Sequence, residues 1–371
     1  MTTVSLVHER ITELGGSEKV VDELAKTFDI QGLFVPISDR RGIGLDLDEL
    51  AVTTSPLQRV YRHDGRYSHL LPALPISFRS FDPGTSDAVI VSHHAFANRV
   101  AHSVRDRPVI SYVHSPARWM WDQRFARAEA PSAAAYVVLR TFCATQRPLD
   151  RRAAKCVTRL LANSSEVAGR IARWWDCDAE VVSPPVDVGF FTPDPSVKRD
   201  DSFLYAGRLV GYKRPDIAIR AARRAGVRLI VAGDGREIDR CKELAGPETS
   251  FVGPVDDIGL RHLFRKSQAL IFPGLEDFGM IPVEAQATGL PVIGLGQGGI
   301  RDTVIDGTTG WWVGSEIDMD DTSTLVEAFA TALETFAASS FDEEKIIAHA
   351  EQFAPEVFRS RMQAIVQASL A

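Results

Sequence analysis

Ala269-Leu-Ile-Phe-Pro-Gly-Leu-Glu-Asp-Phe-Gly-Met-Ile-Pro-Val-Glu284 contains a short apolar run, a loop and the start of a helix. The pattern predicts a strand over Ala269–Phe272 that ends at the Pro-Gly pair. It also predicts a helix that begins at Pro282, because proline fits the first helical position. The loop amides and the positive end of the helix dipole favour an anion here. Gly279 has no Cβ, so the backbone can approach that anion closely.

Two carboxylates flank this predicted anion site. Glu276 lies in the loop, and Glu284 is expected in the first turn of the helix. Carboxylates repel phosphate and suit hydroxyl groups better, and a ligand with central phosphates and hydroxyl-rich ends is a nucleotide sugar. Taken alone, however, a first-turn acid and a solvated loop acid have ordinary structural explanations, so the two glutamates need support from other segments.

Size and composition bound the class of protein. A chain of 371 residues suits two domains, and 45% hydrophobic with 25% charged residues is typical of a soluble globular protein. The net charge of −7 argues against a general nucleic-acid binder. We expect neither a bilayer-spanning helix nor a secretion signal, and the four cysteines lack disulfide or zinc spacing, so the expected location is cytoplasmic.

The first half of the chain predicts a doubly wound sheet. A strand over Thr3–Val7, the pair Gly15-Gly16 and a helix over Ser17–Phe28 form the usual opening of such a sheet, whose ligands collect at the carboxyl ends of the strands. By itself the glycine pair predicts a tight turn with positive φ. Further strands are predicted over Gly32–Pro36, Asp87–Ser92, Pro108–His114, Arg159–Ala162 and Glu180–Val182.

The second half restarts the alternation after a proline-rich link. Pro184, Pro185, Pro193 and Pro195 predict a semi-rigid hinge. The strands and helices that follow predict a second parallel sheet, and a cleft between two such lobes is the usual place for a ligand. The predicted elements are strands Phe203–Ala206, Arg228–Ala232, Ser250–Val252 and Pro291–Leu295, and helices Pro215–Ala225, Glu237–Leu244, Asp257–Lys266, Pro282–Thr288 and a last one from Phe353.

Two cations stand beside one of these predicted helices. Arg208 and Lys213 precede Pro215, which marks a first helical turn. A cation beside a helix N-terminus is unfavourable by about 0.3–1 kcal/mol. Each charge-assisted hydrogen bond to a bound anion contributes about 1.5–3 kcal/mol, so the balance favours a phosphate site.

Aromatic and basic residues gather in two segments of the first half. In Tyr112–Asp122, His114 ends a buried strand, where a histidine is often only a satisfied core residue. Arg118, Trp119 and Trp121 follow in a predicted loop, and their exposure would be costly unless they stack on a ligand such as a sugar ring. Residues 57–81 interleave basic with aromatic and aliphatic side chains; a cover over the first domain and an acceptor or membrane contact explain this equally well.

Three motifs resemble one enzyme family. Glu276-x7-Glu284 with Phe278-Gly279 is similar to the E-x7-E signature of retaining GT-B glycosyltransferases of family four, and Gly207–Arg214 is similar to their G-R-[LF]-x-x-x-K-[GR] motif. Tyr112–Asp122 resembles the H-[ST]-P-x-R-[YW]-x-W-D stretch of a bacterial subgroup that adds mannose to O-antigen and related polysaccharides. The resemblance covers nearly the whole chain.

The resemblance implies an α/β fold of the GT-B type. Two Rossmann-like doubly wound domains, at 1–186 and 187–352, would face a central cleft, and a C-terminal helix at 353–371 would cross back to the first domain. The implied activity is retaining transfer of a sugar, with mannose from GDP-mannose as the leading donor, to a glycan or polyprenyl-linked acceptor. A peripheral contact with the inner face of the membrane is a further expectation.

The resemblance also implies roles for individual residues. Arg208, Lys213 and amides near Gly16 would hold the diphosphate, Glu276 and His114 the donor sugar, and Glu284 the ribose. The catalytic candidates are His114, Arg208, Lys213 and Glu276. The donor-binding candidates are Gly15, Gly16, Arg208, Lys213, Val252, Glu276, Asp277, Phe278, Gly279, Met280 and Glu284, and the acceptor candidates are Arg118, Trp119 and Trp121. Arg214 receives no role.

Other readings remain open. The donor could instead be a UDP- or ADP-sugar, or the protein could bind nucleotide sugars without catalysis. An NAD enzyme needs an N-terminal fingerprint that is missing, and Gly294-x-Gly296-x-x-Gly299 precedes a helix too short for a crossover. Asp-x-Asp triplets occur at Asp46, Asp176 and Asp318, but none directly follows a buried strand. We therefore expect no metal, and no cofactor beyond the nucleotide-sugar co-substrate.

Overall fold

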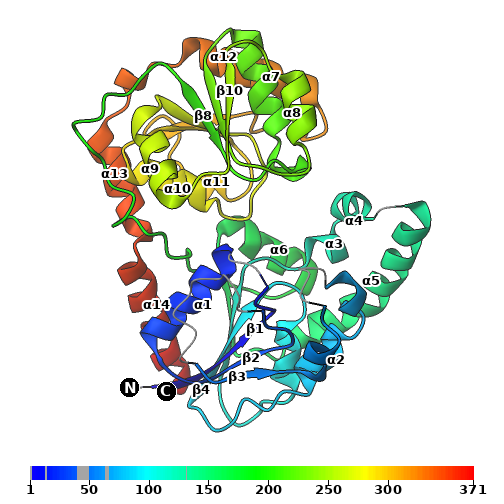
Figure 1. The fold of residues 1–371 in the computed structure, drawn as a ribbon. Helices are drawn as coiled ribbons and strands as arrows, with labels where there is room; N and C mark the ends of the chain where they lie inside the picture. Colours follow the sequence, from blue (N-terminus) through cyan, green and yellow to red (C-terminus); the bar gives the residue numbers. More distant parts are fainter. Residues whose placement is uncertain (1, 13–14, 40–49, 63–66, 131) are drawn as a thin grey trace. The chain divides into compact units, whose positions relative to one another are not determined.

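A computed structural model describes residues 2–12, 15–39, 50–62, 67–130 and 132–371 (Figure 1). The chain divides into two compact units. Unit 1 comprises residues 1–185 and 356–371, and unit 2 comprises residues 186–355. The predicted boundaries after residues 186 and 352 lie close to these limits. The triplet at Asp46–Asp48 lies outside the described residues, as do His63 and Arg66 of the basic and aromatic segment.

Unit 1 is built on a parallel sheet of seven strands in the order β3-β2-β1-β4-β5-β6-β7. The strand order reverses between β1 and β4, and such a switch point is where doubly wound sheets bind ligands. The strands predicted for this unit are confirmed with ends shifted by at most three residues, whereas β3 was not predicted. The strands are β1 Thr3–His8, β2 Asp29–Val35, β3 Val52–Thr54, β4 Ala88–His93, β5 Val109–Val113, β6 Arg159–Ala162 and β7 Glu180–Val181.

Helices from both ends of the chain cover this sheet (Figure 1). The last helix, α14, packs Phe358, Met362, Ile365 and Val366 into the same core as Leu24 of α1, so the predicted return of the C-terminal helix to the first domain is confirmed. Val357, predicted on the buried face, is 42% exposed. The α-helices of unit 1 are α1 Gly16–Thr27, α2 Leu74–Arg79, α3 Arg118–Trp121, α4 Gln123–Glu129, α5 Ala133–Ala154, α6 Ser165–Trp175 and α14 Pro355–Leu370.

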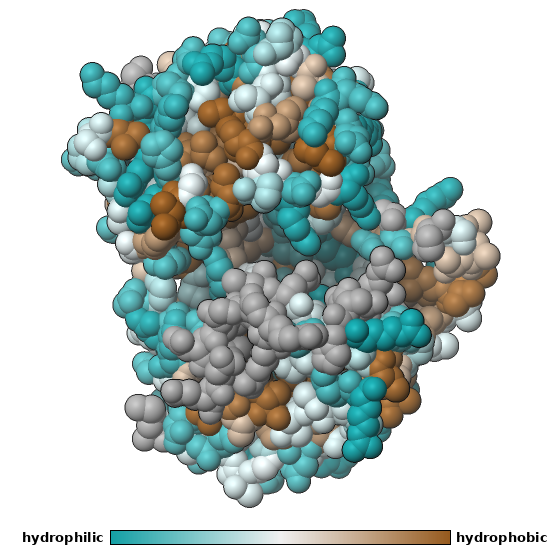
Figure 2. All heavy atoms as spheres, viewed as in Figure 1, coloured by the Kyte–Doolittle hydropathy of each residue, from teal (hydrophilic) through white to brown (hydrophobic). Residues whose placement is uncertain are grey.

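The longest helix of unit 1, α5, was not predicted. It runs for 22 residues and contains Pro148, and its buried side chains begin only at Cys143. Its first half exposes Val137 (63%) and Val138 (70%), and Figure 2 shows brown and tan surface on the part of unit 1 that α4 and α5 form. None of the helices within the described residues is both long and apolar enough to cross a bilayer.

The basic and aromatic segment 57–81 forms part of the core of unit 1. It contains the 3-10 helices η2 (Pro56–Arg59) and η3 (Ser68–Leu70) and the helix α2. Tyr61, Leu70, Leu74 and Phe78 are at most 6% exposed and pack with side chains of β4 and β5. Within its described residues the segment therefore packs over the first unit, and an acceptor or membrane contact of its exposed side chains stays a prediction.

Unit 2 has a parallel sheet of six strands in the order β10-β9-β8-β11-β12-β13, and its switch point lies between β8 and β11. The predicted strands of this unit are confirmed to within one residue, and β13 was not predicted. The strands are β8 Phe203–Ala206, β9 Leu229–Ala232, β10 Thr249–Gly253, β11 Ala269–Phe272, β12 Val292–Leu295 and β13 Gly310–Val313. The helices are α7 Pro215–Ala225, α8 Ile238–Leu244, α9 Asp257–Lys266, α10 Met280–Ala287, α11 Ile300–Thr303, α12 Thr322–Thr335 and α13 Glu343–Ala350.

One helix start in unit 2 corrects the sequence prediction. Helix α10 begins at Met280, so Pro282 is its third residue rather than its first. Proline is tolerated there because none of the first amides of a helix has an acceptor inside the helix. Glu284 consequently lies in the second turn and not in the first. The four-residue α11 confirms that the glycine run at Gly294–Gly299 does not open a crossover helix.

Candidate active site

Two loops meet at the switch point of unit 2. One follows β8 and carries Arg208 and Lys213, and the other follows β11 and carries Glu276. Gly274 allows their contact: a Cβ at this position would lie 2.9 Å from the Cα of Lys213, which is closer than real Cβ atoms come to backbone. Gly274 therefore permits the close approach of the two loops.

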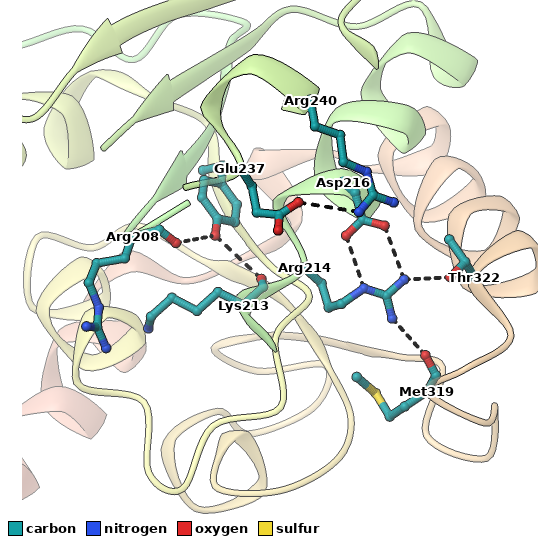
Figure 3. A network of polar contacts seen from close by, with 9 residues as sticks. Arg208, Lys213, Arg214, Asp216, Glu237, Arg240, Met319 and Thr322 are labelled. Carbon is teal, nitrogen blue, oxygen red and sulfur yellow. Dashed lines mark hydrogen bonds and ion pairs between the residues drawn. The ribbon is translucent and has the colours of Figure 1, made fainter. Parts of the chain in front are cut away.

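This contact brings together three residues that the sequence predicted. Lys213 Nζ donates to Glu276 Oε1, and the two side chains are 16% and 19% exposed. Arg208 is exposed, and its Nη2 donates to the hydroxyl of Tyr212 at 2.9 Å. In Figure 3 the Arg208 and Lys213 side chains extend to the same side of their loop. Two cations and a carboxylate thus share one end of the sheet.

The start of α10 lies on the same loop as Glu276. Gly279 is the N-cap residue and has φ of 94°, a conformation that glycine adopts without a Cβ clash. The first-turn amides of α10 have no acceptor within the helix and suit an anion, as predicted for Phe278, Gly279 and Met280. Phe278 is 4% exposed and packs edge-on against Phe353 at 5.6 Å, so it anchors the loop.

The remaining donor candidates of unit 2 are Glu284 in α10, Asp277 in the loop after β11 and Val252 in β10. Glu284 is 6% exposed on α10. Asp277 stands between Glu276 and Phe278 in the loop, and the carbonyl of Glu276 accepts from the amide of Gly299 at 2.9 Å. Val252 is in β10, at the edge of the sheet, with β9 between it and β8, and it is 46% exposed.

Arg214 has a structural role that the sequence did not reveal. Its backbone is left-handed (φ 52°) at the N-cap of α7, and its side chain points away from Arg208 and Lys213 (Figure 3). The guanidinium donates to Asp216 at 3.0 Å, to the carbonyl of Met319 at 2.7 Å and to Thr322 at 2.7 Å. Arg214 therefore fixes the end of the Lys213 loop. In the sequence, Asp216, two residues after Arg214, was the available sign that Arg214 forms an ion pair.

Arg214 also lines a separate cavity of about 260 Å³. Four of the five charged side chains of its lining are paired with one another, Arg214 with Asp216 and Arg240 with Glu237 at 3.3 Å. We therefore assign this cavity no ligand.

In unit 1 the glycine pair stands at the start of α1. Gly15 is the N-cap residue with φ of −133°, so the predicted positive φ is wrong at this position. Its amide donates to Glu18 Oε2 at 3.0 Å, and Ser17 Oγ donates to the same oxygen at 2.8 Å. The turn is held by a carboxylate in the first helical turn rather than by unusual backbone geometry, because that carboxylate takes up a free amide.

His114 directly follows β5 and is 8% exposed. Its Nε2 lies 2.7 Å from Ser92 Oγ, and its ring stacks on that of His94 with centroids 4.6 Å apart. Burial, together with the nearby charge of His114, holds the pKa of His94 well below its usual range. Burial also lowers the pKa of His93 to about 3. The imidazoles of His93 and His94, near His114, are therefore neutral.

A second carboxylate is buried at the same switch point. Glu9, directly after β1, is 2% exposed. It accepts hydrogen bonds from the amides of Ala95, Phe96 and Ala97 at 3.0–3.2 Å, at the start of the 3-10 helix η4 (Ala97–His102). Glu9 thus ties the end of β1 to the segment after β4.

A cavity of about 240 Å³ opens beside Glu9. Two of the three predicted acceptor residues, Arg118 and Trp119, line it, together with Tyr67 and His94. Its lining is Glu9, Arg10, Tyr67, Leu71, Leu74, His94, Ala95, Phe96, Ser115, Pro116, Ala117, Arg118 and Trp119.

The third predicted acceptor residue, Trp121, packs elsewhere. Its ring stacks on Trp174 with centroids 6.1 Å apart, and its Nε1 donates to Asp150 at 3.0 Å. Arg118, Trp119 and Trp121 lie in the short helix α3 and not in the predicted loop, and aromatic side chains of the protein itself pack against the two indoles. Trp119, for example, stacks on Phe142 at 6.5 Å.

A doubly wound unit with paired cations and helix amides at its switch point, preceded by a second doubly wound unit, defines the class of two-domain nucleotide-sugar glycosyltransferases. Two family models match the chain in succession, Glycosyltransferase Family 4 over residues 14–190 and Glycosyl transferases group 1 over residues 191–338. The chain belongs to this glycosyltransferase family.

Curated relatives are D-inositol 3-phosphate glycosyltransferases. The Nocardioides sp. (strain JS614) protein is 26% identical over 350 residues, which span 80% of this chain and 74% of that protein. The Kribbella flavida protein is 30% identical over 285 residues, which span 67% and 64%. The aligned part is thus about two thirds to three quarters of these relatives. Their names mention neither mannose nor a polysaccharide, so those expectations from Tyr112–Asp122 remain predictions.

Solved structures show the same fold. Anabaena HepE in complex with UDP and glucose superposes with a TM-score of 0.70 at 16% identity, over 99% of this chain and 100% of that chain. Sucrose-phosphate synthase from Thermosynechococcus elongatus gives a TM-score of 0.73 at 16% identity, over 99% of both chains. The predicted α/β fold with two Rossmann-like domains is confirmed.

Proposed function

We propose that the protein is a retaining hexosyltransferase that moves a sugar from a nucleoside diphosphate to a hydroxyl acceptor. The observation that carries this proposal is the contact of Lys213 with Glu276 at neighbouring strand ends, beside the first turn of α10. A cation and free helix amides suit a diphosphate, and the adjacent carboxylate suits the hydroxyls of a sugar.

The proposed reaction needs stabilisation of a leaving group. The bond between the anomeric carbon and the phosphate oxygen breaks, and negative charge develops on the nucleoside diphosphate. Arg208, Lys213 and the first-turn amides of α10 would stabilise that charge. The acceptor oxygen bonds to the anomeric carbon on the face that the phosphate leaves, and its proton passes to the leaving phosphate. We assign no protein nucleophile and no metal.

The proposed donor is GDP-mannose, on the strength of the Tyr112–Asp122 motif. A UDP-sugar is the competing donor, because structures of the same fold hold UDP. Initial rates with GDP-mannose, UDP-glucose and ADP-glucose at equal concentration, with product anomers assigned by NMR, test both points. We expect at least tenfold faster transfer from GDP-mannose and an α-linked product. A preference for UDP-glucose would overturn the donor alone, and an inverted anomer would overturn retention.

Two acceptor classes have support in unit 1. The motif resemblance favours a glycan or polyprenyl-linked acceptor, which would bring the protein to the inner face of the membrane. The relatives are named for D-inositol 3-phosphate, and Arg10 and Arg118 line the cavity beside Trp119, so a phosphorylated cyclitol is the second candidate. The arginines favour an anionic group on the acceptor.

Replacement of one arginine distinguishes the two classes. With an anionic acceptor, Arg118→Ala should raise the acceptor KM about tenfold and weaken its salt dependence, as expected when one ionic contact is lost. With a neutral glycan the KM should change less than threefold. Arg105→Ala, an exposed arginine outside the cavity, is the matched control and should leave KM unchanged.

A further inference from the structure

The residue after Arg208 is held by the loop that follows β9. The amide of Leu209 donates to the carbonyl of Asp234 at 2.8 Å, and the carbonyl of Leu209 accepts from the amide of Glu237 at 3.0 Å. The Leu209 side chain is fully buried in the core of unit 2. Both backbone groups and the side chain of Leu209 are therefore held in place, which fixes the backbone on one side of Arg208.

Two glycines of the loop after β9 allow this close approach. A Cβ at Gly235 would lie 2.4 Å from the carbonyl oxygen of Leu209, and a Cβ at Gly233 would lie 2.0 Å from that of Gly207. Both distances are shorter than real Cβ atoms come to backbone. The two glycines thus contact the residue before Arg208 and the residue after it, and a larger residue at either position would displace the backbone that carries Arg208.

The other end of the same loop is held by different parts of unit 2. Lys213 packs on Gly274 of the loop after β11 and pairs with Glu276 of that loop. The next residue, Arg214, is anchored by its guanidinium to groups at or just before the starts of α7 and α12. None of these contacts involves the loop after β9. The two cations of the proposed site are therefore positioned by two separate sets of contacts.

We propose that Gly233, Asp234 and Gly235 position Arg208, and not Lys213, for the transfer reaction. They are positioning residues, because they contact the backbone on either side of Arg208 and act on the leaving group only through its side chain. Their effect on rate rests on the proposed function, in which Arg208 stabilises the nucleoside diphosphate. The contacts themselves do not rest on it, because they can be measured without substrate.

A double-mutant cycle with Gly235→Ala tests this selectivity. The added methyl group must move Leu209 and with it Arg208, so kcat/KM should fall about tenfold, which is part of the 10²–10³-fold loss usual for a whole charge-stabilising group. In an Arg208→Ala background the same substitution should change kcat/KM less than twofold, because the side chain through which it acts is gone. In a Lys213→Ala background the tenfold loss should remain. An equal loss in the Arg208→Ala background, or no loss in the Lys213→Ala background, overturns the proposal.

Gly226→Ala is the matched control for lost stability. Gly226 ends α7 in the same unit and has φ of 67°, so alanine there strains the backbone, but its Cβ would meet nothing within 4 Å. This variant should lower the melting temperature and leave kcat/KM unchanged. A tenfold loss in Gly226→Ala as well would show that reduced stability, and not a displaced Arg208, lowers the rate.

Asp234 supplies a milder variant that keeps the proposal testable if Gly235→Ala does not fold. Its exposed side chain accepts from the amide of Gly235 at 2.7 Å and so supports the turn. Asp234→Ala should lower kcat/KM two- to fivefold, within the scale of one hydrogen bond, and should have no effect in the Arg208→Ala background. Asp234→Asn keeps the acceptor and should retain the rate. A rate for Asp234→Ala equal to that of the unsubstituted protein contradicts the positioning role.

Hydrogen exchange without substrate separates failure of these contacts from failure of the proposed function. The reference is the buried amide of Leu270, which donates to the carbonyl of Pro291 in the same unit, because a loss of global stability accelerates both amides. Relative to Leu270, the Leu209 amide should exchange at least tenfold faster in Gly235→Ala or Asp234→Ala than in the unsubstituted protein. An unchanged ratio overturns the proposed contacts. An unchanged kcat/KM in Arg208→Ala alone would instead refute the role of Arg208 in the proposed function, and with it the effect of the loop on rate.

Discussion

In both units the strand order reverses next to the first strand of the sheet, between β1 and β4 in unit 1 and between β8 and β11 in unit 2. At the switch point of unit 1, Glu9, His8 and Ser92 bond to protein groups and are at most 2% exposed. At that of unit 2, Arg208 is exposed, and Lys213 and Glu276 keep 16% and 19% of their side-chain surface.

The same sheet topology therefore serves two different purposes at the two switch points. The buried polar groups of unit 1 have their partners already, so they fix positions and contribute to stability. The long, at least partly exposed side chains of unit 2 can exchange one partner for another, which suits charge that appears only during a reaction. Substitutions at the switch point of unit 1 should therefore change stability or side-chain orientation. Substitutions at the switch point of unit 2 should change the rate of transfer.

Loss of the cations of unit 2 should have the largest effect. Lys213→Ala should lower kcat/KM about 10²–10³-fold, the usual loss for one group that stabilises developing charge. The melting temperature should change little, because the ion pair is partly exposed. Initial rates measure this loss. The control is Arg228→Ala, because Arg228 directly precedes β9, at the opposite end of the sheet, and pairs there with Asp201. Donor affinity and transfer that survive Arg208→Ala together with Lys213→Ala would refute the proposed mechanism.

Glu9→Gln tests the opposite expectation for unit 1. An amide in place of the carboxylate leaves an NH₂ facing the backbone donors of Ala95–Ala97, so buried hydrogen bonds are lost. We expect a loss of about 2–4 kcal/mol in unfolding free energy and a fall of roughly 5–15 °C in melting temperature. Calorimetry measures it. Asp82→Asn, an exposed carboxylate that also accepts from a backbone amide, should shift the melting temperature by less than about 2 °C.

The buried carboxyl group of Asp150 in unit 1 should make the unfolding free energy depend on pH. Burial raises its pKa from 3.8 to about 6, although Trp121 and Trp175 both donate to it. Between these values the folded state binds more protons than the unfolded state, so the unfolding free energy falls as pH rises from about 4 to about 6. The loss is on the order of 1–3 kcal/mol.

The difference in melting temperature between the unsubstituted protein and Asp150→Asn isolates this titration, because other groups titrate in both. The melting temperature of Asp150→Asn should rise relative to that of the unsubstituted protein as the pH increases from 4 to 7. A difference that stays constant over this range would show that Asp150 does not titrate there.

The smallest expected effect is that of metal removal. If the cations of unit 2 stabilise the leaving group, turnover in excess EDTA should equal turnover in buffer within experimental error. Strict dependence on added Mg²⁺ or Mn²⁺ would contradict the proposed role of Lys213. Calcium–EDTA at the same ionic strength controls for screening, because exposed charges respond to salt.

Local sequence patterns were sufficient for most of unit 2. Short apolar strands alternate there with helices whose starts are marked by proline or aspartate, as at Pro215 and Asp257, and both helices begin as predicted. Helix α5 escaped prediction because only Cys143, Asp150, Ala153 and Ala154 are buried, too few for a helical period, and because a proline such as Pro148 normally predicts the end of a helix.

The candidate site was only partly readable from the sequence. The motifs assigned Lys213 and Glu276 to one nucleotide-sugar site at the ends of adjacent strands, but their direct contact was not predicted. The hydrogen bonds of Ser92 with His8 and His114 join residues up to 84 positions apart, so no local pattern encodes them. A polar residue at or near the end of three strands, at His8, Ser92 and His114, was the available signal. Arg214 was missed because its role depends on Met319 and Thr322, about a hundred residues away.

The position of α14 in unit 1 has a consequence for biosynthesis. A ribosome releases residues 1–185 first, but the core of unit 1 still lacks Phe358, Met362, Ile365 and Val366 at that moment. Unit 2, whose residues are contiguous, can complete its core while the seven-stranded sheet still exposes apolar surface. The part of the molecule that is synthesised first is therefore the part that finishes folding last, and nascent chains stalled before residue 356 should bind chaperones through unit 1.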